Sequence, residues 1–114
     1  MCHPSVEPWW DEFSDLMAQI ESSPDEPYWL SINNSGLLVE PMVDSVVATS
    51  LYLIWRSLED MYELRPDERS EANALMRSGA REWLAVKDDD AARSRYLDHW
   101  RYDVCGYERP LLPP

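Results

Sequence analysis

Apolar residues recur at helical spacing along the start of the chain. Over residues 9–22 five apolar side chains fall on one stripe: Trp9, Phe13, Leu16, Met17 and Ile20. Pro8 suits a first helical turn, and the acids at 11 and 12 complement the positive end of the helix dipole. The segment "SSPDEP" at 22–27 then breaks the pattern. We therefore predict a helix over residues 9–22, with Asp11 and Asp15 on its solvent-facing side.

Two longer helices are predicted over residues 42–64 and 66–87. The first is the most hydrophobic segment of the chain, which predicts a central helix, and Arg65-Pro66 ends it. The second opens at Pro66 and carries a clear buried stripe that includes Gly79. Glycine costs a helix about 1 kcal/mol relative to alanine. We therefore expect a neighbouring helix to approach closely at Gly79.

A fourth helix is predicted over residues 89–104. The aspartates at 88–90 supply its N-cap, and Gly106 supplies the stop. Residues 107–114 form an extended tail, and residues 1–7 a short N-terminal lead. The whole chain, residues 1–114, has the length of one acidic helical domain.

Residues 28–40, "YWLSINNSGLLVE", show a different pattern. Tyr28, Leu30 and Ile32 alternate, and residues 33–36 are turn formers. This pattern predicts two short strands around a turn. The predicted fold class is accordingly mainly α, a compact four-helix domain with a small β-hairpin between its first two helices.

The charge is unevenly distributed along the chain. Residues 1–55 contain nine acids and no Lys or Arg, a net charge of −9, whereas the remainder adds 13 acids and 10 bases, and the total is −12. Phosphate contacts need Lys and Arg, so this balance disfavours direct binding of nucleic acid or of a membrane surface. A basic protein surface fits the sign of the charge best.

The longest uncharged apolar run spans 11 residues, 45–55, far fewer than the roughly 20 that cross a bilayer. The chain starts without a basic segment followed by an apolar one, so we expect no signal peptide and a cytoplasmic location. Two cysteines near opposite ends do not form a disulfide framework.

Catalytic and metal-binding chemistry finds little support in the sequence. The chain has two histidines, His3 and His99, and no glycine-rich phosphate loop. Together with Cys2 and Cys105 they would make four zinc ligands, but their spacing matches no zinc motif. We therefore predict a non-enzymatic protein without catalytic residues, metal or cofactor.

An acidic cluster on the second helix offers an enzymatic alternative. Glu59, Asp60 and Glu63 stand at i, i+1 and i+4 in "EDMYE". This segment resembles the first half of the E-E-x-x-E motif of helical nucleotide pyrophosphohydrolases, and the resemblance implies acids that hold magnesium. The second acidic pair of that family has no match in form or spacing here. Solvated acids at a helix end are the other interpretation.

Two further patterns leave alternatives open. Arg69, Arg77 and Arg81 follow one flank of the third helix and either form a basic strip for a partner or pair with the acidic first half, which we favour. Trp9 fits the apolar stripe of the first helix, which leaves Trp10 at its edge. Trp10 then either covers the seam with residues 28–40 or is an exposed contact for a partner.

These patterns favour a binding protein that inhibits or masks a basic, nucleic-acid-binding site on a partner protein. An anti-defence inhibitor of the anti-CRISPR kind, acting as a nucleic-acid mimic, and an immunity protein against a nuclease toxin both require such a surface. An acidic chaperone for a secreted effector is another option. The predicted partner-binding residues are Trp10, Asp11, Glu12, Asp15, Asp25 and Glu26.

Overall fold

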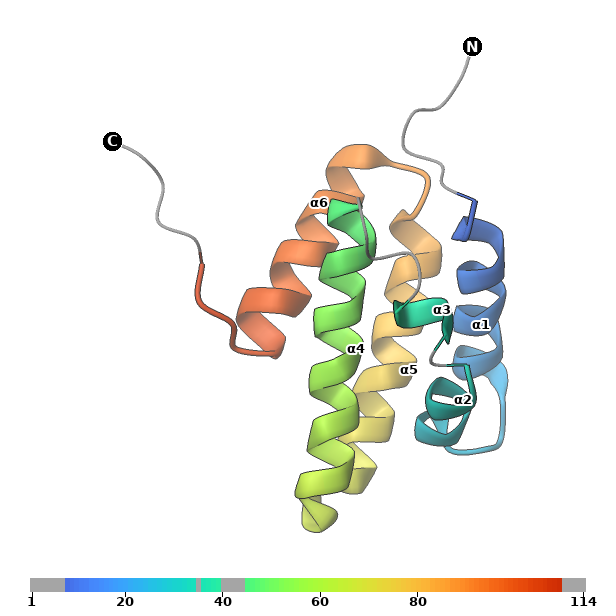
Figure 1. Cartoon of the computed structure of the whole chain (residues 1–114), viewed down its shortest axis with the longest axis vertical. Coiled ribbons are helices and arrows are strands. Elements are labelled where there is room, and N and C mark those ends of the chain that lie inside the picture. The colour runs from blue at the N-terminus through green and yellow to red at the C-terminus, as the bar shows by residue number, and fades with distance from the viewer. Residues whose placement is uncertain (1–7, 35, 40–44, 110–114) are drawn as a thin grey trace.

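The computed structural model describes residues 8–34, 36–39 and 45–109, which fold into helices connected by short turns (Figure 1). The elements in chain order are α1 (Trp10–Ser22), α2 (Pro27–Asn33), α3 (Gly36–Val39), α4 (Val46–Leu64), the 3₁₀ turn η2 (Pro66–Glu68), α5 (Arg69–Val86), α6 (Asp90–Asp98) and the π-helical turn η3 (His99–Val104). No strand occurs within these ranges. The predicted mainly helical class is confirmed.

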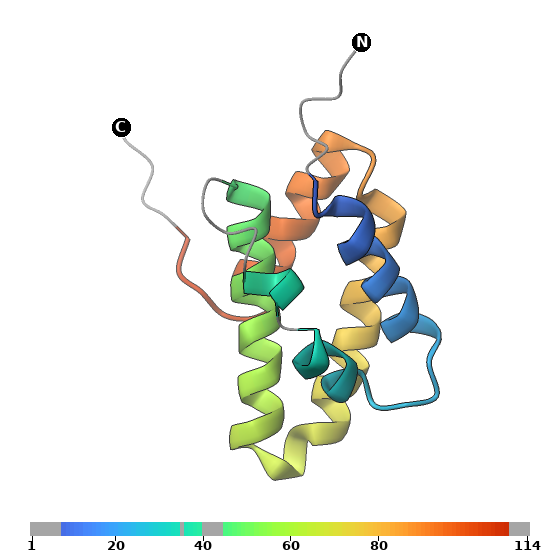
Figure 2. The same ribbon diagram turned by 45° about the vertical axis from the view of Figure 1, so that its right-hand side comes forward.

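Helix α5 lies at the centre of the fold and packs against α1, α2, α4 and α6. In Figure 1, α4 and α5 run side by side, α1 lies to the right of α5, and α6 lies to the left. The short helices α2 and α3 cross the space between α1 and α4, as the turned view in Figure 2 also shows. The core is rich in aromatic rings, with Trp55, Trp83 and Trp100 almost fully buried. Among the described residues, no helix combines the length and apolarity needed to cross a membrane.

The four predicted helices correspond to α1, α4, α5 and α6 followed by η3, but the predicted count of four is too low, because α2 and α3 are also helical. Helix α1 begins at Trp10, and α4 ends at Leu64 as predicted, although residues 42–44 lie outside the described ranges. The cap at the start of α6 is confirmed, because the Asp89 side chain accepts a hydrogen bond from the Ala92 N–H at 3.0 Å. Gly106 adopts a φ of 79° just beyond η3, the left-handed conformation that ends helices.

The predicted β-hairpin is wrong, because residues 27–33 and 36–39 form the helices α2 and α3. Pro27 occupies the first turn of α2, where its missing N–H costs nothing. The Tyr28 N–H donates to the Asn73 side-chain oxygen of α5 at 3.1 Å, which satisfies a free donor of that helix end. Tyr28 and Ser31 are both buried, and their i, i+3 spacing is helical. Docking onto α4 and α5 thus overrides the strand propensity of this segment.

The close approach predicted at Gly79 is confirmed. The Tyr96 hydroxyl of α6 donates to the Gly79 carbonyl at 2.8 Å, and the Trp100 ring covers the same position. A Cβ atom added to Gly79 would lie 3.5 Å from that ring, which is ordinary van der Waals contact. The site is close-packed but has room for a methyl group.

Candidate protein-interaction surface

Every carboxylate in the described part of the first half is exposed to solvent. These six groups form what we call the N-terminal acidic surface: Asp11, Glu12, Asp15, Glu21, Asp25 and Glu26. Five of them were predicted as partner-binding residues. Four of the six carboxylates lie on helix α1. They face solvent because the opposite face of the helix, which includes Phe13, Met17 and Ile20, is buried in the core.

The N-terminal acidic surface takes no part in the ion pairs of the described residues. Those pairs all join groups in the second half: Arg56–Asp60, Arg65–Glu68, Lys87–Asp88, Arg93–Asp90, His99–Asp103 and Arg109–Asp103. Like charges on one face repel each other, and nearby opposite charges would reduce that cost. The described part of the fold thus carries this repulsion without compensation by ion pairs.

Arg77 reaches the first half of the chain but binds its main chain. Its guanidinium donates to the carbonyl oxygens of Ile20 at 3.1 Å, Ser23 at 2.7 Å and Asp25 at 2.8 Å. The last carbonyls of a helix have no partner within it, so Arg77 closes the C-terminal end of α1. Arg77 therefore contacts the first half through carbonyl oxygens, and its predicted pairing with carboxylates there is wrong within the described residues.

The other two arginines of this flank lie elsewhere. Arg69 packs over the Tyr62 ring, 4.8 Å from its centroid, and donates to the Tyr62 carbonyl at 3.0 Å. Arg81 is exposed, with a long 3.5 Å contact to Ser78. The predicted pairing with acidic side chains of the first half is wrong for both within the described residues.

Trp10 is buried, with only 3% of its surface exposed, so its prediction as an exposed contact is wrong. Its ring packs against Trp83 with centroids 5.1 Å apart, and the Arg93 guanidinium of α6 lies 5.1 Å from its centroid. Spacings of three and four both keep residues on one helix face, so a stripe starting at Trp10 is as helical as one starting at Trp9. Trp9 lies at the edge of the buried face, where it is half-buried against Phe13.

The exposed aromatic ring near the acidic surface is Trp29, which the sequence analysis did not single out. It is 53% exposed and lies on α2, one helical turn after Glu26. Its ring meets Tyr28 edge-on at 5.1 Å and Tyr62 at 6.3 Å. The available signal was Pro27 at a helix start, since a helix that buries Tyr28 and Ser31 turns the intervening Trp29 outward.

The acids of "EDMYE" all have partners within the protein. Glu59 is 7% exposed and accepts a short hydrogen bond from the Ser31 hydroxyl, and burial raises its pKa. The Glu63 carboxylate accepts from the Tyr28 hydroxyl at 2.6 Å, and Asp60 pairs with Arg56 at 3.5 Å. The described residues contain no group of three metal-ligating side chains. Glu59 and Glu63 thus hold α2 and α4 together, and Asp60 pairs within α4.

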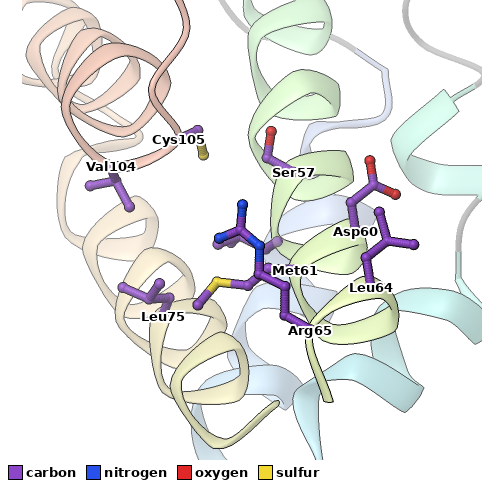
Figure 3. A pocket seen from close by; sticks show the side chains of 9 residues that line it. Ser57, Asp60, Met61, Leu64, Arg65, Leu75, Val104 and Cys105 are labelled. Carbon is purple, nitrogen blue, oxygen red and sulfur yellow. The ribbon is translucent and has the colours of Figure 1, made fainter. Parts of the chain in front are cut away.

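A cavity of about 250 Å³ lies between the second half of α4, α5 and the end of η3 (Figure 3). Met61, Leu64, Leu75 and Val104 line it together with the polar groups of Ser57, Asp60 and Arg65. Ligand pockets usually hold about 300–1,000 Å³, so this space is small for a nucleotide.

The candidate zinc ligands divide between described and undescribed parts of the chain. Cys2 and His3 lie outside the described residues. Cys105 borders the cavity with its thiol 3.7 Å from the Ile54 carbonyl, and burial raises the pKa of that thiol to about 11. His99 contacts Asp103 at 3.3 Å. A thiol with such a pKa is a weak nucleophile at neutral pH.

Comparisons of the chain with protein-family models, with curated proteins and with solved structures found no match.

Proposed function

We propose that this protein binds a basic surface on a partner protein through its N-terminal acidic surface and thereby blocks a site that would otherwise bind nucleic acid. The observation that supports the proposal is the exposure of six carboxylates without an ion pair in the described residues. Uncompensated repulsion lowers the stability of a compact state. A basic partner would relieve it on binding, which gives such a surface a use.

The density of charge on α1 supports mimicry of a nucleic-acid backbone. Asp11, Glu12 and Asp15 place three charges within about 6 Å of helix rise. One strand of DNA carries one charge per roughly 3.4 Å, which is a comparable density. An acidic face of this kind also steers association with a basic partner.

Two biological settings require this binding mode. One is immunity against a nuclease toxin, and the other is inhibition of a nucleic-acid-binding defence complex. A chaperone for a basic effector would use the same surface without blocking an activity. Inhibition of the partner's nuclease or nucleic-acid binding separates the first two settings from the third.

The test is affinity capture from the native host at low salt with three forms of the protein. The first is wild type, and the second carries D11K, D15K and D25K. The third carries D67K, E71K and D98K, three exposed acids of the second half, and so has the same net charge as the second. We expect the wild type and the third form to capture one basic partner and the second form to lose it.

The recovered partner then allows a quantitative test. Screening shortens the Debye length from about 30 Å at 0.01 M salt to about 8 Å at 0.15 M, so association should slow steeply over that range. Double-stranded DNA or RNA should compete with the protein for the partner. Equal binding by the second and third forms, or association that is insensitive to salt, would contradict the proposal.

The proposal assigns no catalytic role to Glu59, Asp60 or Glu63, whose internal partners support a structural role. The alternative function makes a distinct prediction. Mg²⁺-dependent hydrolysis of nucleoside triphosphates by the purified protein, lost in E59Q, would replace the binding proposal with the enzymatic one.

A further inference from the structure

Trp29 is a large exposed aromatic side chain held on a rigid base. Its ring lies edge-on against Tyr28, and Tyr28 stacks on Tyr62 with planes only 7° from parallel. Both tyrosines are 7% exposed, so the support belongs to the core while the tryptophan faces solvent. A partner that covers Trp29 would lose little side-chain entropy there, because the ring is already positioned.

Two exposed carboxylates lie at the edge of this aromatic cluster. Glu63 accepts a hydrogen bond from the Tyr28 hydroxyl, and Glu26 accepts one from the Tyr62 hydroxyl. Each carboxylate is therefore one hydrogen bond away from a ring that contacts Trp29. A carboxylate offers about four acceptor positions, so both keep capacity for a further donor.

The cluster already holds one guanidinium group from the protein itself. Arg69 covers the Tyr62 ring at 4.8 Å and is fixed there by its bond to the Tyr62 carbonyl. Arg69 contributes one positive charge to the cluster, and Glu26 and Glu63 contribute two negative ones, so the cluster beside Trp29 is negative by one charge. A planar guanidinium stacks on an indole face and binds a carboxylate with two parallel bonds, whereas an ammonium group does neither as well.

We propose that Trp29, together with the carboxylates of Glu26 and Glu63, receives an arginine side chain of the basic partner. This inference rests on the proposed function and adds the residue type that the partner presents. The N-terminal acidic surface attracts any basic surface, and the Trp29 cluster selects arginine over lysine.

Two fluorescently labelled peptides, octa-arginine and octa-lysine, serve as probes because they carry equal charge. Fluorescence anisotropy at low salt measures their affinity for wild-type protein, W29A and W29F. We expect wild type to bind octa-arginine about three- to tenfold more tightly than octa-lysine, in line with about 1 kcal/mol for a stacked cation. W29A should bring the ratio of the two affinities close to one, because only the affinity for octa-arginine falls. W29F should keep part of the preference for octa-arginine.

Controls separate this inference from the proposed function. L64A removes another exposed apolar side chain, 76% exposed, and should leave the ratio unchanged. The D11K, D15K, D25K form should lose affinity for both peptides equally. The far-UV circular dichroism of W29A should match wild type, which shows that the variant is folded. Its thermal midpoint should be lower, because the buried half of Trp29 packs on Tyr28 and Tyr62.

Each other outcome has a defined meaning. An unchanged ratio in W29A, with both peptides bound, would overturn the arginine site and leave the proposed function standing. Binding that falls in W29A but ignores the charge reversals on α1 and the loop would keep the arginine site and overturn the N-terminal acidic surface. If neither peptide binds, both the arginine site and the proposed function are overturned.

Discussion

The rings of Tyr28 and Tyr62 stack face to face, with centroids 3.8 Å apart. Their hydroxyls are bound in crossed order. Tyr28 on α2 donates to Glu63 on α4 at 2.6 Å, and Tyr62 on α4 donates at 2.7 Å to Glu26, the N-cap residue of α2. The stacked pair therefore joins the acidic loop and α2 to the central helices at two points.

Removal of either hydroxyl should weaken this junction while the stack remains. We expect Y28F and Y62F each to lower the free energy of unfolding by about 1 kcal/mol, less than is usual for hydrogen bonds to charged groups, because both carboxylates are exposed and can be hydrated instead. Urea unfolding at neutral pH measures this. Y52F is the control, because the Tyr52 hydroxyl has no hydrogen bond within the described residues. Loss of stability no greater than in that control would contradict the prediction.

The same pair predicts a loss of stability at high pH. Burial, and next the hydrogen bond to Glu63, raise the pKa of Tyr28 to about 12, whereas an unfolded chain releases this proton near pH 10. Between these values the unfolded state binds fewer protons, so the contribution of Tyr28 is complete below about pH 10 and is lost as the pH approaches about 12. The stability difference between wild type and Y28F should shrink over this range in urea titrations. A constant difference would contradict the shift.

Glu59 predicts a dependence in the acid range. Burial raises its pKa, while the Ser31 hydrogen bond and the charge of Arg56 act in the opposite direction. A raised pKa means that the stability from Glu59 is complete below its unfolded value near pH 4.5 and is lost as the pH rises through the folded value. E59Q, which can still accept from Ser31, should therefore be more stable than wild type at pH 7, with a smaller gain towards pH 4.

D67N is the matched control for E59Q, because Asp67 is exposed and its loss also removes one negative charge from the total of −12. We compare the midpoints of urea unfolding of both variants between about pH 4 and pH 7. The difference between them gives the effect of burying the Glu59 charge, apart from the change in net charge. If E59Q is less stable than wild type at pH 7, the Ser31 bond to the charged carboxylate outweighs the cost of its burial.

The helical elements were predictable where the apolar pattern continued over several turns. For α1, α4 and α5 the repeated spacing of apolar residues defines one face to bury, and most of those residues are buried. Residues 27–33 and 36–39 form helices of seven and four residues, too short for a repeat to develop, and Tyr, Trp and Ile favour strands. Helix α2 is held by contacts with Asn73, Glu59 and Glu63, which are distant in the chain.

The candidate surface was predictable in part for the same reason. Acids opposite an apolar stripe face solvent, and α1 places Asp11 and Asp15 there. The choice between Trp9 and Trp10 depends on Arg93 of α6, which covers Trp10, and no local pattern contains that contact. Exposure of Trp29 follows from the helical form of α2 and was hidden by the predicted hairpin.

Arg77 should matter for stability more than other arginines of its helix. It supplies donors to three carbonyls at the end of α1 and in the following loop. We expect R77M to lower the free energy of unfolding by about 1–3 kcal/mol, because those carbonyls then depend on water for a hydrogen bond. R77K should lower it by less. R81M, at an exposed position, should change stability by no more than about 0.5 kcal/mol. Urea unfolding compares the three, and equal effects of R77M and R81M would contradict the assigned role.

Gly79, inside α5, and Gly106, just beyond η3, should respond oppositely to alanine. At Gly79 the added methyl group meets the Trp100 ring at 3.5 Å, an ordinary contact, so G79A should raise stability by up to about 1 kcal/mol through helix propensity. At Gly106 the φ of 79° is costly for any residue with a Cβ atom, so G106A should lower stability by about 1–2 kcal/mol. Thermal unfolding of both variants measures the contrast. A destabilised G79A would contradict this prediction, because it would show that the methyl group disturbs the Trp100 ring or the Tyr96 hydroxyl bound to the Gly79 carbonyl.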